Sequence, residues 1–486
     1  MDKIKVLGIA RLLGLALIFV LILVLQYCRV NFLAPPPESI WDNVYLWDWA
    51  RNFSNGDFSS FVVDSHHQLR WGNWGFAAIL IKLFSDEIVF YYLATLIPST
   101  LAILIFCYLA WKNIGFVGAL LFVVLWFFDA LLFRATFQLL PSGSALLPVS
   151  LLLLLCCQLI QLRKITLAWQ FAIAITLFWL YGVKETYLAF MPAVIYLVYS
   201  FGGLRVVLNI FALLLVGYVT ETIAFSLIAP DFSNMGRIHA IVDGGQHVKL
   251  MTEQAKYVAS QTRYFDSGIT MRWVLTSGVT SIAIFMGFGF ALLSKTIDFG
   301  SGVTRGLNNR LNFMHVLSAF IISFVIFTTF FVISINPIRL GHPLVPRYVT
   351  VLMPLVYLMI VGFLTLQARH ASVLIKFGLI AMIPFYIASS IDRYSNYRQL
   401  SIFLISDNHN IFAQKLDNSD CVRAKGQSIL LNQLDLIPEG YRTAKVSKFI
   451  ADKNPIMQKQ WFVIKLDPDR ACKNMYSIYH HATMRY

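Results

Sequence analysis

Two carboxylates stand among aromatic residues in the stretch WDNVYLWDWA, residues 41–50, just after the first long apolar run of the chain. A carboxylate in such a place can act as a general base that takes a proton from a hydroxyl group. On a helix at about 100° per residue, Asp42 shares a face with Tyr45, and Asp48 lies about 120° away. The two acids therefore do not form the close pair of retaining glycoside hydrolysis, and each is a candidate for a single base.

A third acid, Glu38, follows three prolines at the expected start of a short helix over residues 38–53. A carboxylate there also stabilises the helix N-terminus through the helix dipole, so Glu38 has a structural alternative to catalysis. The aromatic residues of this helix are expected to anchor it at the membrane–water interface. Asp42, Asp48 and Glu38 thus compete for the role of base, and Tyr45 is a candidate substrate contact.

Basic residues form a second group of candidates, because a phosphate must be bound by cations. The candidates for this role are Arg134, Lys184 and Arg347. Other ionisable residues expected to line the same site are His66, His67, Arg70, Glu185 and His342. The plainer alternative is that these are interfacial or surface residues, with Lys184 and Glu185 paired to each other. No His and Cys spacing matches a zinc site, so no metal ligand is predicted, and a divalent cation stays an open alternative.

The elements that must position these residues are membrane helices. Of the 486 residues, 58% are hydrophobic and 13% are charged, whereas soluble domains carry about 25% charged residues. Apolar runs of about 18 residues or more predict spanning helices. An all-α polytopic membrane protein of about eleven spans is therefore expected, over residues 7–30, 87–111, 114–134, 143–162, 166–183, 186–203, 206–229, 271–294, 311–335, 348–366 and 372–391.

The basic residues of the turns predict the topology, because cytoplasmic loops retain lysine and arginine. With the N-terminus in the cytoplasm, the cytoplasmic turns hold Lys3, Lys5, Arg11, Lys112, Arg163, Lys164, Arg205, Lys295, Arg305, Arg310, Arg369 and Lys376. An odd number of spans then places the C-terminus in the periplasm, outside the cell inner membrane. This bias accounts for the net charge of +14, so no nucleic-acid partner is expected. The first run exceeds the about 7–15 apolar residues of a signal peptide, so it is expected to be an uncleaved span.

The predicted outer face receives all the candidate site residues and three longer segments, 31–86, 230–270 and the polar tail 392–486. Residues 1–391 are expected to form the transmembrane domain. The tail is expected to form a small α/β domain, because its runs SILLNQ and QWFVIKL are strand-like. Cys421 and Cys472 both lie in the tail, where a periplasmic location favours a disulfide between them.

Three sequence stretches resemble those of a known superfamily. DNVYLWDWARNFSNGDF, which begins at Asp42, is similar to the first-loop signature of GT-C fold glycosyltransferases, in particular the protein O-mannosyltransferase and lipid A aminoarabinose transferase branch. YGVKETYLAFMPAVIYLV resembles a later turn of that superfamily in which a lysine precedes a span. HPLVPRYVTVLMPLVYL resembles its Arg-Tyr turn, which has a proline downstream.

The resemblance implies a GT-C architecture with interfacial helices in the first outer loop. It implies a donor that carries a sugar on a polyprenyl phosphate, with transfer on the extracytoplasmic face. The acceptor would be a hydroxyl of lipopolysaccharide or O-antigen, of another glycolipid, or of a protein. Asp42 has the family's spacing to Tyr45, so the resemblance favours Asp42 as the base of a single displacement. Because phosphate is a good leaving group, cations that neutralise it would complete the chemistry.

Two other functions are compatible with part of this pattern. A surface-polysaccharide ligase or polymerase also uses polyprenyl-linked sugars on the outer face. A transporter or lipid flippase would instead place charged residues near the span centres and open to both faces. The span centres of this sequence are almost uncharged, which favours the transferase.

Overall fold

The structure is a computed structural model. It describes residues 2–29, 41–58, 69–162, 165–228, 287–292, 309–330, 332–335, 338–340, 349–367, 421–425, 442–443, 461–465 and 475–478. The predicted span 372–391 and the predicted outer loop 230–270 lie outside these residues, as does most of the predicted span 271–294.

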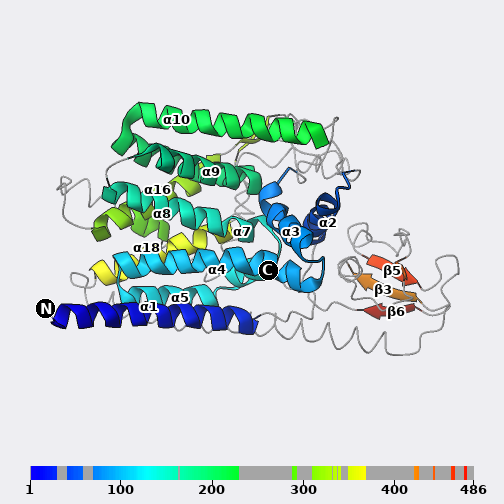
Figure 1. Cartoon of the computed structure of the whole chain (residues 1–486), viewed down its shortest axis with the longest axis horizontal. Coiled ribbons are helices and arrows are strands. Elements are labelled where there is room, and N and C mark those ends of the chain that lie inside the picture. Colours follow the sequence, from blue (N-terminus) through cyan, green and yellow to red (C-terminus); the bar gives the residue numbers. More distant parts are fainter. Residues whose placement is uncertain are drawn as a thin grey trace.

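A bundle of long apolar helices forms the body of the molecule (Figure 1). Its members are α1 (Asp2–Arg29), α4 (Ile88–Asn113), α5 (Phe116–Phe128), α8 (Leu146–Leu162), α9 (Leu167–Val183), α10 (Met191–Ile228), α16 (Asn309–Phe330) and α18 (Met353–Gln367). Within the described residues, three helical segments are long and apolar enough to cross a membrane, namely Val89–Asn113, Pro141–Ile160 and Glu185–Ile228. Four shorter apolar helices accompany them. The chain is therefore a helical integral membrane protein, as the sequence predicts.

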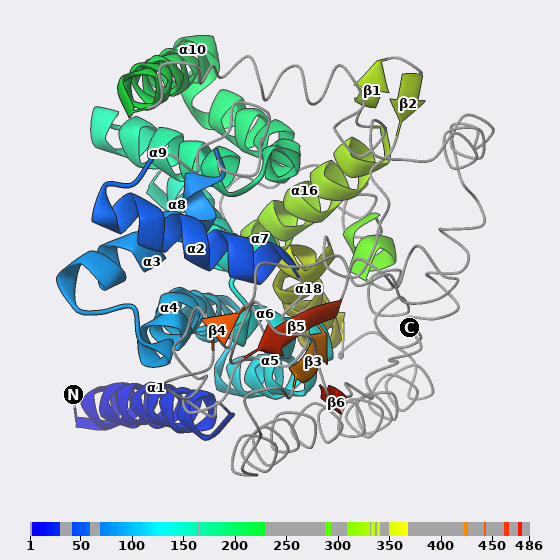
Figure 2. The same ribbon diagram turned by 90° about the vertical axis from the view of Figure 1, so that its right-hand side faces the viewer.

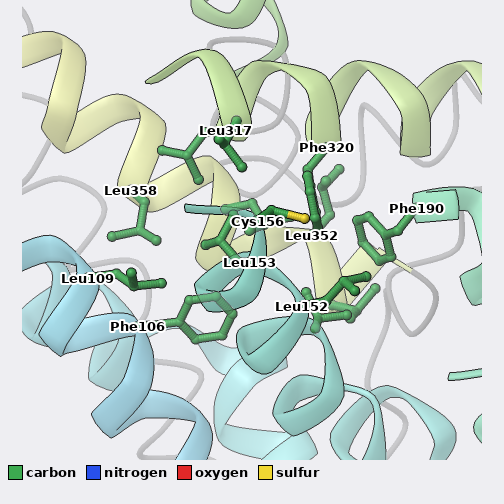
Figure 3. Packing of buried hydrophobic residues seen from close by; sticks show 14 of the residues in the cluster. Phe106, Leu109, Leu152, Leu153, Cys156, Phe190, Leu317, Phe320, Leu352 and Leu358 are labelled. Carbon is green, nitrogen blue, oxygen red and sulfur yellow. The ribbon is translucent and has the colours of Figure 1, made fainter. Parts of the chain in front are cut away.

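The core of the bundle joins helices that are far apart in the sequence (Figure 3). Phe106 of α4 and Cys156 of α8 belong to the same buried cluster as Phe320 of α16 and Leu358 of α18. Two 3₁₀ helices, η1 (Glu185–Phe190) and η2 (Thr350–Leu352), add Phe190 and Leu352 to it. Because lipid tails are as apolar as these side chains, close packing rather than water exclusion stabilises such a core.

Three of the predicted spans differ from the observed helices. The predicted span 114–134 is broken at Asp129 into α5 and α6 (Ala130–Phe137), with a bend of 78° between them. The predicted spans 186–203 and 206–229 form η1 and one long stretch, α10, that is kinked at Gly203. The φ angle of Gly203 is 73°, in the left-handed region that favours glycine. The predicted span 114–134 therefore consists of two helices with a sharp bend between them, because a polar residue there starts a new helix.

The predicted span 311–335 also ends early, at Phe330. Residues Val332–Ile335 form strand β1, which pairs antiparallel with β2 (Ile338–Leu340). The segment VISI is rich in β-branched residues, which favour a strand over a helix end. The turn predicted between the spans 311–335 and 348–366 therefore includes a short hairpin.

Strands of the C-terminal tail form a four-stranded sheet with the order β4-β5-β3-β6. They are β3 (Cys421–Lys425), β4 (Arg442–Thr443), β5 (Trp461–Lys465) and β6 (Met475–Ile478). β3 pairs antiparallel with β5 and parallel with β6. The predicted strand in QWFVIKL is confirmed as β5, while SILLNQ lies outside the described residues. In Figure 1, β3, β5 and β6 lie beyond the same end of the bundle as α2.

Two shorter helices lie across this end of the bundle (Figures 1 and 2). They are α2 (Trp41–Asn55), close to the predicted bounds 38–53, and α3 (Trp71–Leu83). Trp47 of α2 is 0% exposed and packs edge-to-face on Tyr91 of α4, with the ring centroids 5.4 Å apart. The expectation that the aromatic residues of α2 are interfacial anchors is therefore wrong for Trp47, which is a core residue.

Candidate active site

The start of α3 touches the end of α9 through two glycines. A Cβ atom on Gly72 would lie 2.6 Å from the backbone nitrogen of Val183. A Cβ atom on Gly182 would lie 2.5 Å from the indole of Trp71. Ordinary contacts of a Cβ atom begin at about 3.4 Å, so only hydrogen fits at either position. We call this contact the glycine seam, and it fixes the first turn of α3 against the turn that follows α9.

Polar contacts cross the glycine seam to three different elements. Arg70 Nη2 lies 3.3 Å from Glu185 Oε2 at the start of η1. Asn73 Nδ2 donates to the carbonyl oxygen of Val183 at 2.9 Å, and this carbonyl lies in the last turn of α9. Trp71 Nε1 donates to Glu221 Oε1 of α10 at 2.6 Å.

Four charged side chains are buried among the residues that the structure describes: Arg70, Asp129, Lys184 and Glu221. Three of them lie at this one place, with exposures of 8% for Arg70, 5% for Lys184 and 6% for Glu221. Lys184 has an extended backbone between α9 and η1, and Glu185 follows it directly. We call Arg70, Lys184, Glu185 and Glu221 the seam charge cluster.

The seam charge cluster contains two cations and two carboxylates. Burying a charge is costly unless it is paired and hydrogen-bonded. Arg70 is paired with Glu185, and Glu221 accepts a hydrogen bond from the indole N–H of Trp71. A guanidinium carries five N–H donors, so Arg70 can bind Glu185 and a further anion together. The cluster can therefore bind an anion through its cations and a hydroxyl group through its carboxylates.

An apolar groove of about 710 Å³ adjoins the cluster, between α3, α9 and α10. Aromatic rings line much of it, among them Trp71, Trp74 and Phe178. Glu221 is the one charged residue among those that line it within the described chain. We call this space the α3–α10 groove. Trp71 and Glu221 line the groove and are also hydrogen-bonded to each other beside the glycine seam.

Three of the predicted site residues are brought together by the structure: Arg70, Lys184 and Glu185. The sequence analysis grouped these residues only because all three are predicted to lie on the outer face of the membrane. The ion pair between Arg70 and Glu185 joins residues that are 115 positions apart in the sequence. Among the other candidates, Asp48 is half-buried on α2. The backbones of Asp42 and Tyr45 lie in α2, and that of Arg134 lies in α6, but their side chains are not described.

The remaining candidates lie outside the described residues: Glu38, His66, His67, His342, Arg347 and Cys472. Cys421 is placed only by its backbone, at the first position of β3. Within the described part of the chain, no group of three or more His, Cys, Asp or Glu residues could hold a metal ion.

Glu221, Trp71 and Asn73 are site residues that were not among the candidates. Glu221 had a signal in the sequence, since an acid within an apolar run marks a functional position by default. Trp71 and Asn73 had none, because their partners Glu221 and Val183 are 150 and 110 positions away.

These features define a helical integral membrane protein with a buried charge cluster at one end of its bundle, beside an apolar groove. Comparison with known proteins found no matching family model and no matching curated protein. Among solved structures, the chain is similar to the crystal structure of ArnT from Cupriavidus metallidurans bound to undecaprenyl phosphate. The two share 12% identity with a TM-score of 0.49, over 87% of this chain and 85% of ArnT.

Proposed function

We propose that this protein is a membrane glycosyltransferase. It transfers a sugar from a polyprenyl-phosphate donor to a hydroxyl group of a cell-envelope acceptor, which is lipopolysaccharide or O-antigen, a glycolipid or a protein. The observation that carries the proposal is the seam charge cluster directly beside the α3–α10 groove, joined through Trp71 and Glu221. An apolar groove that ends at buried charges suits a substrate with an apolar chain and a polar head.

The α3–α10 groove suits the isoprenoid chain of the donor rather than its phosphate. No cation is among the residues that line it within the described chain, and Glu221 would repel a phosphate placed there. Arg70 precedes the groove residue Trp71 by one position, so the chain can lie in the groove while the phosphate reaches the cations of the cluster. Arg134 and Arg347 are proposed as further phosphate ligands.

The chemistry needs a base for the acceptor hydroxyl and cations for the departing phosphate. We assign the base to Asp42, on its spacing to Tyr45 in the stretch that resembles GT-C transferases. The structure supports the assignment in one respect, because α2 packs on α3, the helix that begins at the seam charge cluster. Asp48 on the same helix and Glu38 before it are the alternatives for this role.

The positions of the buried charges favour a transferase over a transporter. Arg70, Lys184 and Asp129 lie just outside the ends of helices, and Glu221 lies within α10, seven positions before its end. A transport path would require such residues near the middle of several spans. We propose that the α2–α3 end of the bundle faces the periplasm and that the N-terminus is cytoplasmic.

The proposal is tested with the purified protein in lipid nanodiscs. Defined polyprenyl-phosphate sugars with a radiolabel are supplied together with cell-envelope lipids and proteins as acceptors. We expect transfer of one labelled sugar to an acceptor, and loss of transfer when Arg70 and Lys184 are both changed to alanine. Extension of a glycan by many sugars would indicate a ligase or polymerase instead. Labelled solute that accumulates in proteoliposomes, without any transfer, would overturn the proposal.

A further inference from the structure

The side chain of Asn73 lies at the glycine seam, in the first turn of α3, and it is 3% exposed. Its backbone N–H donates to the carbonyl oxygen of Arg70 at 2.9 Å, and its Nδ2 atom donates to the carbonyl oxygen of Val183 at 2.9 Å. Lys184 directly follows Val183. These two hydrogen bonds therefore hold Asn73 between the backbones of the two cations in the seam charge cluster.

The hydrogen bond to Val183 also determines how the carboxamide of Asn73 is turned, since only its nitrogen atom can donate to a carbonyl oxygen. The other atom, Oδ1, is buried and has no hydrogen-bond partner within the part of the chain that the structure describes. A buried acceptor without a partner destabilises a fold, and native proteins contain few of them. A substrate group that donates a hydrogen bond to Oδ1 accounts for its place beside the buried charges.

The chemistry of Oδ1 restricts what it can bind. An amide oxygen accepts hydrogen bonds and cannot donate one. The oxygens of an ionised phosphate are also acceptors, so Oδ1 does not bind the phosphate that the cations Arg70 and Lys184 attract. A sugar hydroxyl is a donor. The substrate group that Oδ1 recognises therefore belongs to the sugar of the donor rather than to its phosphate.

Helix α3 separates this oxygen atom from the isoprenoid chain of the donor. Gly72, Gly75 and Phe76 line the α3–α10 groove, whereas Asn73 is not among the described residues that line it. At about 100° per residue, Asn73 lies about 160° from Gly75 around the helix. The donor can then lie with its chain in the groove, its phosphate at Arg70 where α3 begins, and its sugar on the face of α3 that carries Asn73.

We infer that Asn73 is a specificity-determining residue that accepts a hydrogen bond from a hydroxyl group of the donor sugar. This inference rests on the proposed function, since it takes the seam charge cluster as the site of the donor phosphate. Residues three positions apart on a helix are neighbours, as Arg70 and Asn73 are at the start of α3. The hydroxyl that reaches Oδ1 is therefore the one nearest to the phosphate, on the ring carbon next to the anomeric carbon. A 2-deoxy sugar lacks this group.

The test measures binding of defined probes to the full-length protein in nanodiscs, followed by tryptophan fluorescence, since Trp71 and Trp74 line the groove. The sugar probes are the glucose and mannose esters of farnesyl phosphate and the 2-deoxyglucose ester, which is the 2-deoxy form of both. Farnesyl phosphate and farnesol report the phosphate site without a sugar. We expect the wild type to bind the tighter hexose probe about tenfold better than the 2-deoxy probe, as for one lost hydrogen bond. Asn73→Ala should bind these two probes equally.

Asn113 offers a matched control. Its carboxamide is also buried, donates to the carbonyl oxygen of Leu109 at 2.8 Å and has an Oδ1 atom without a partner among the described residues. It is the last residue of α4, whose first residue follows the last residue of α3 by five positions. About 38 Å of helix thus separates Asn113 from that end of α4. Asn113→Ala removes the same groups and should keep the wild-type preference between the probes.

Three outcomes would count against the inference, and they differ in what they reject. A wild type that prefers farnesyl phosphate to farnesol, but binds the hexose and 2-deoxy probes equally, would overturn the role of Asn73 alone. An Asn73→Ala variant that binds every probe more weakly, yet keeps the preference for the hexose, would show a purely structural role at the seam. A wild type that does not prefer farnesyl phosphate to farnesol would overturn the proposed donor, and the role of Asn73 with it. Should Asn73→Ala fail to insert, the same ratio in Asn73→Ser decides, because the serine oxygen lies one bond short of the position of Oδ1.

Discussion

The contact between Gly72 and Val183 leaves room for hydrogen only, and it lies between residues that hold the seam charge cluster in place. Consider the variant Gly72→Ala, which removes no charge and no hydrogen bond donor. Its methyl group would lie 2.6 Å from the backbone nitrogen of Val183, where ordinary contacts begin at about 3.4 Å. Because the obstacle is backbone rather than a flexible side chain, α3 and α9 must separate by about 1 Å to restore an ordinary contact.

That separation acts directly on the cluster. The distance between Arg70 and Glu185 is 3.3 Å, so an added shift of about 1 Å would break this hydrogen bond. A misplacement of this size at an active site lowers the rate by about 100-fold. Overpacking itself lowers the free energy of unfolding by about 1–3 kcal/mol. We therefore expect Gly72→Ala to lower kcat/KM for sugar transfer by about 100-fold, with a smaller loss of thermal stability.

The matched control is Gly75→Ala, one turn further along α3. A Cβ atom at Gly75 would have nothing within 4 Å, so the substitution adds helix propensity of about 1 kcal/mol without a clash. Because Gly75 also lines the α3–α10 groove, this control is read by its melting temperature and not by sugar transfer. Its melting temperature in detergent should equal or exceed that of the wild type. If Gly72→Ala transferred sugar at the wild-type rate and had the same melting temperature as Gly75→Ala, the glycine seam would not position the seam charge cluster.

Three further predictions concern other parts of the molecule. Asp42→Asn should reduce transfer at least about 100-fold while farnesyl phosphate still binds, and a fully active, properly inserted variant would remove Asp42 from the role of base. Glu221→Ala should lower the free energy of unfolding by about 1–3 kcal/mol, because the indole N–H of Trp71 loses its acceptor, and Glu221→Gln should lose less; equal melting temperatures for both variants would contradict this. Non-reducing peptide mapping of protein from the membrane fraction should recover Cys421 linked to Cys472, and free thiols at both positions would contradict a disulfide between them.

Three of the residues proposed from the sequence lie together in the structure, but their contacts were not predicted. Arg70, Lys184 and Glu185 were candidates because they are ionisable residues in the turns between apolar runs. The sequence suggested Lys184 as the partner of Glu185 because the two residues are neighbours. The ion pair with Arg70 depends instead on how α3 packs on α9, which the sequence alone does not give. The structure pairs Glu185 with Arg70, across the glycine seam. Nothing in the sequence distinguishes Gly72 and Gly182 from the other glycines, of which the chain has 27 in total, as positions of close helix contact.

Features of the fold that follow from long apolar runs were predictable from the sequence, whereas features that follow from the packing of single residues were less so. Long apolar runs gave the helices of the bundle, and their bounds agree closely for α4 and α9. The bend between α5 and α6 falls at Asp129, a single acidic residue within a largely apolar run. Trp47 was expected at the interface, but large aromatic residues suit both an interface and a core, and only the packing of α2 separates the two.

The central claim is that the α3–α10 groove and the seam charge cluster together hold a lipid-linked donor. It is tested most directly with a polyprenyl phosphate that carries a photoreactive group on its apolar chain, crosslinked to the protein in nanodiscs and mapped by mass spectrometry. We predict crosslinks to peptides of α3, α9 and α10, including Trp74 and Phe178, that excess unlabelled polyprenyl phosphate removes. Labelling spread over the lipid-facing helices, and unchanged by the competitor, would contradict the account.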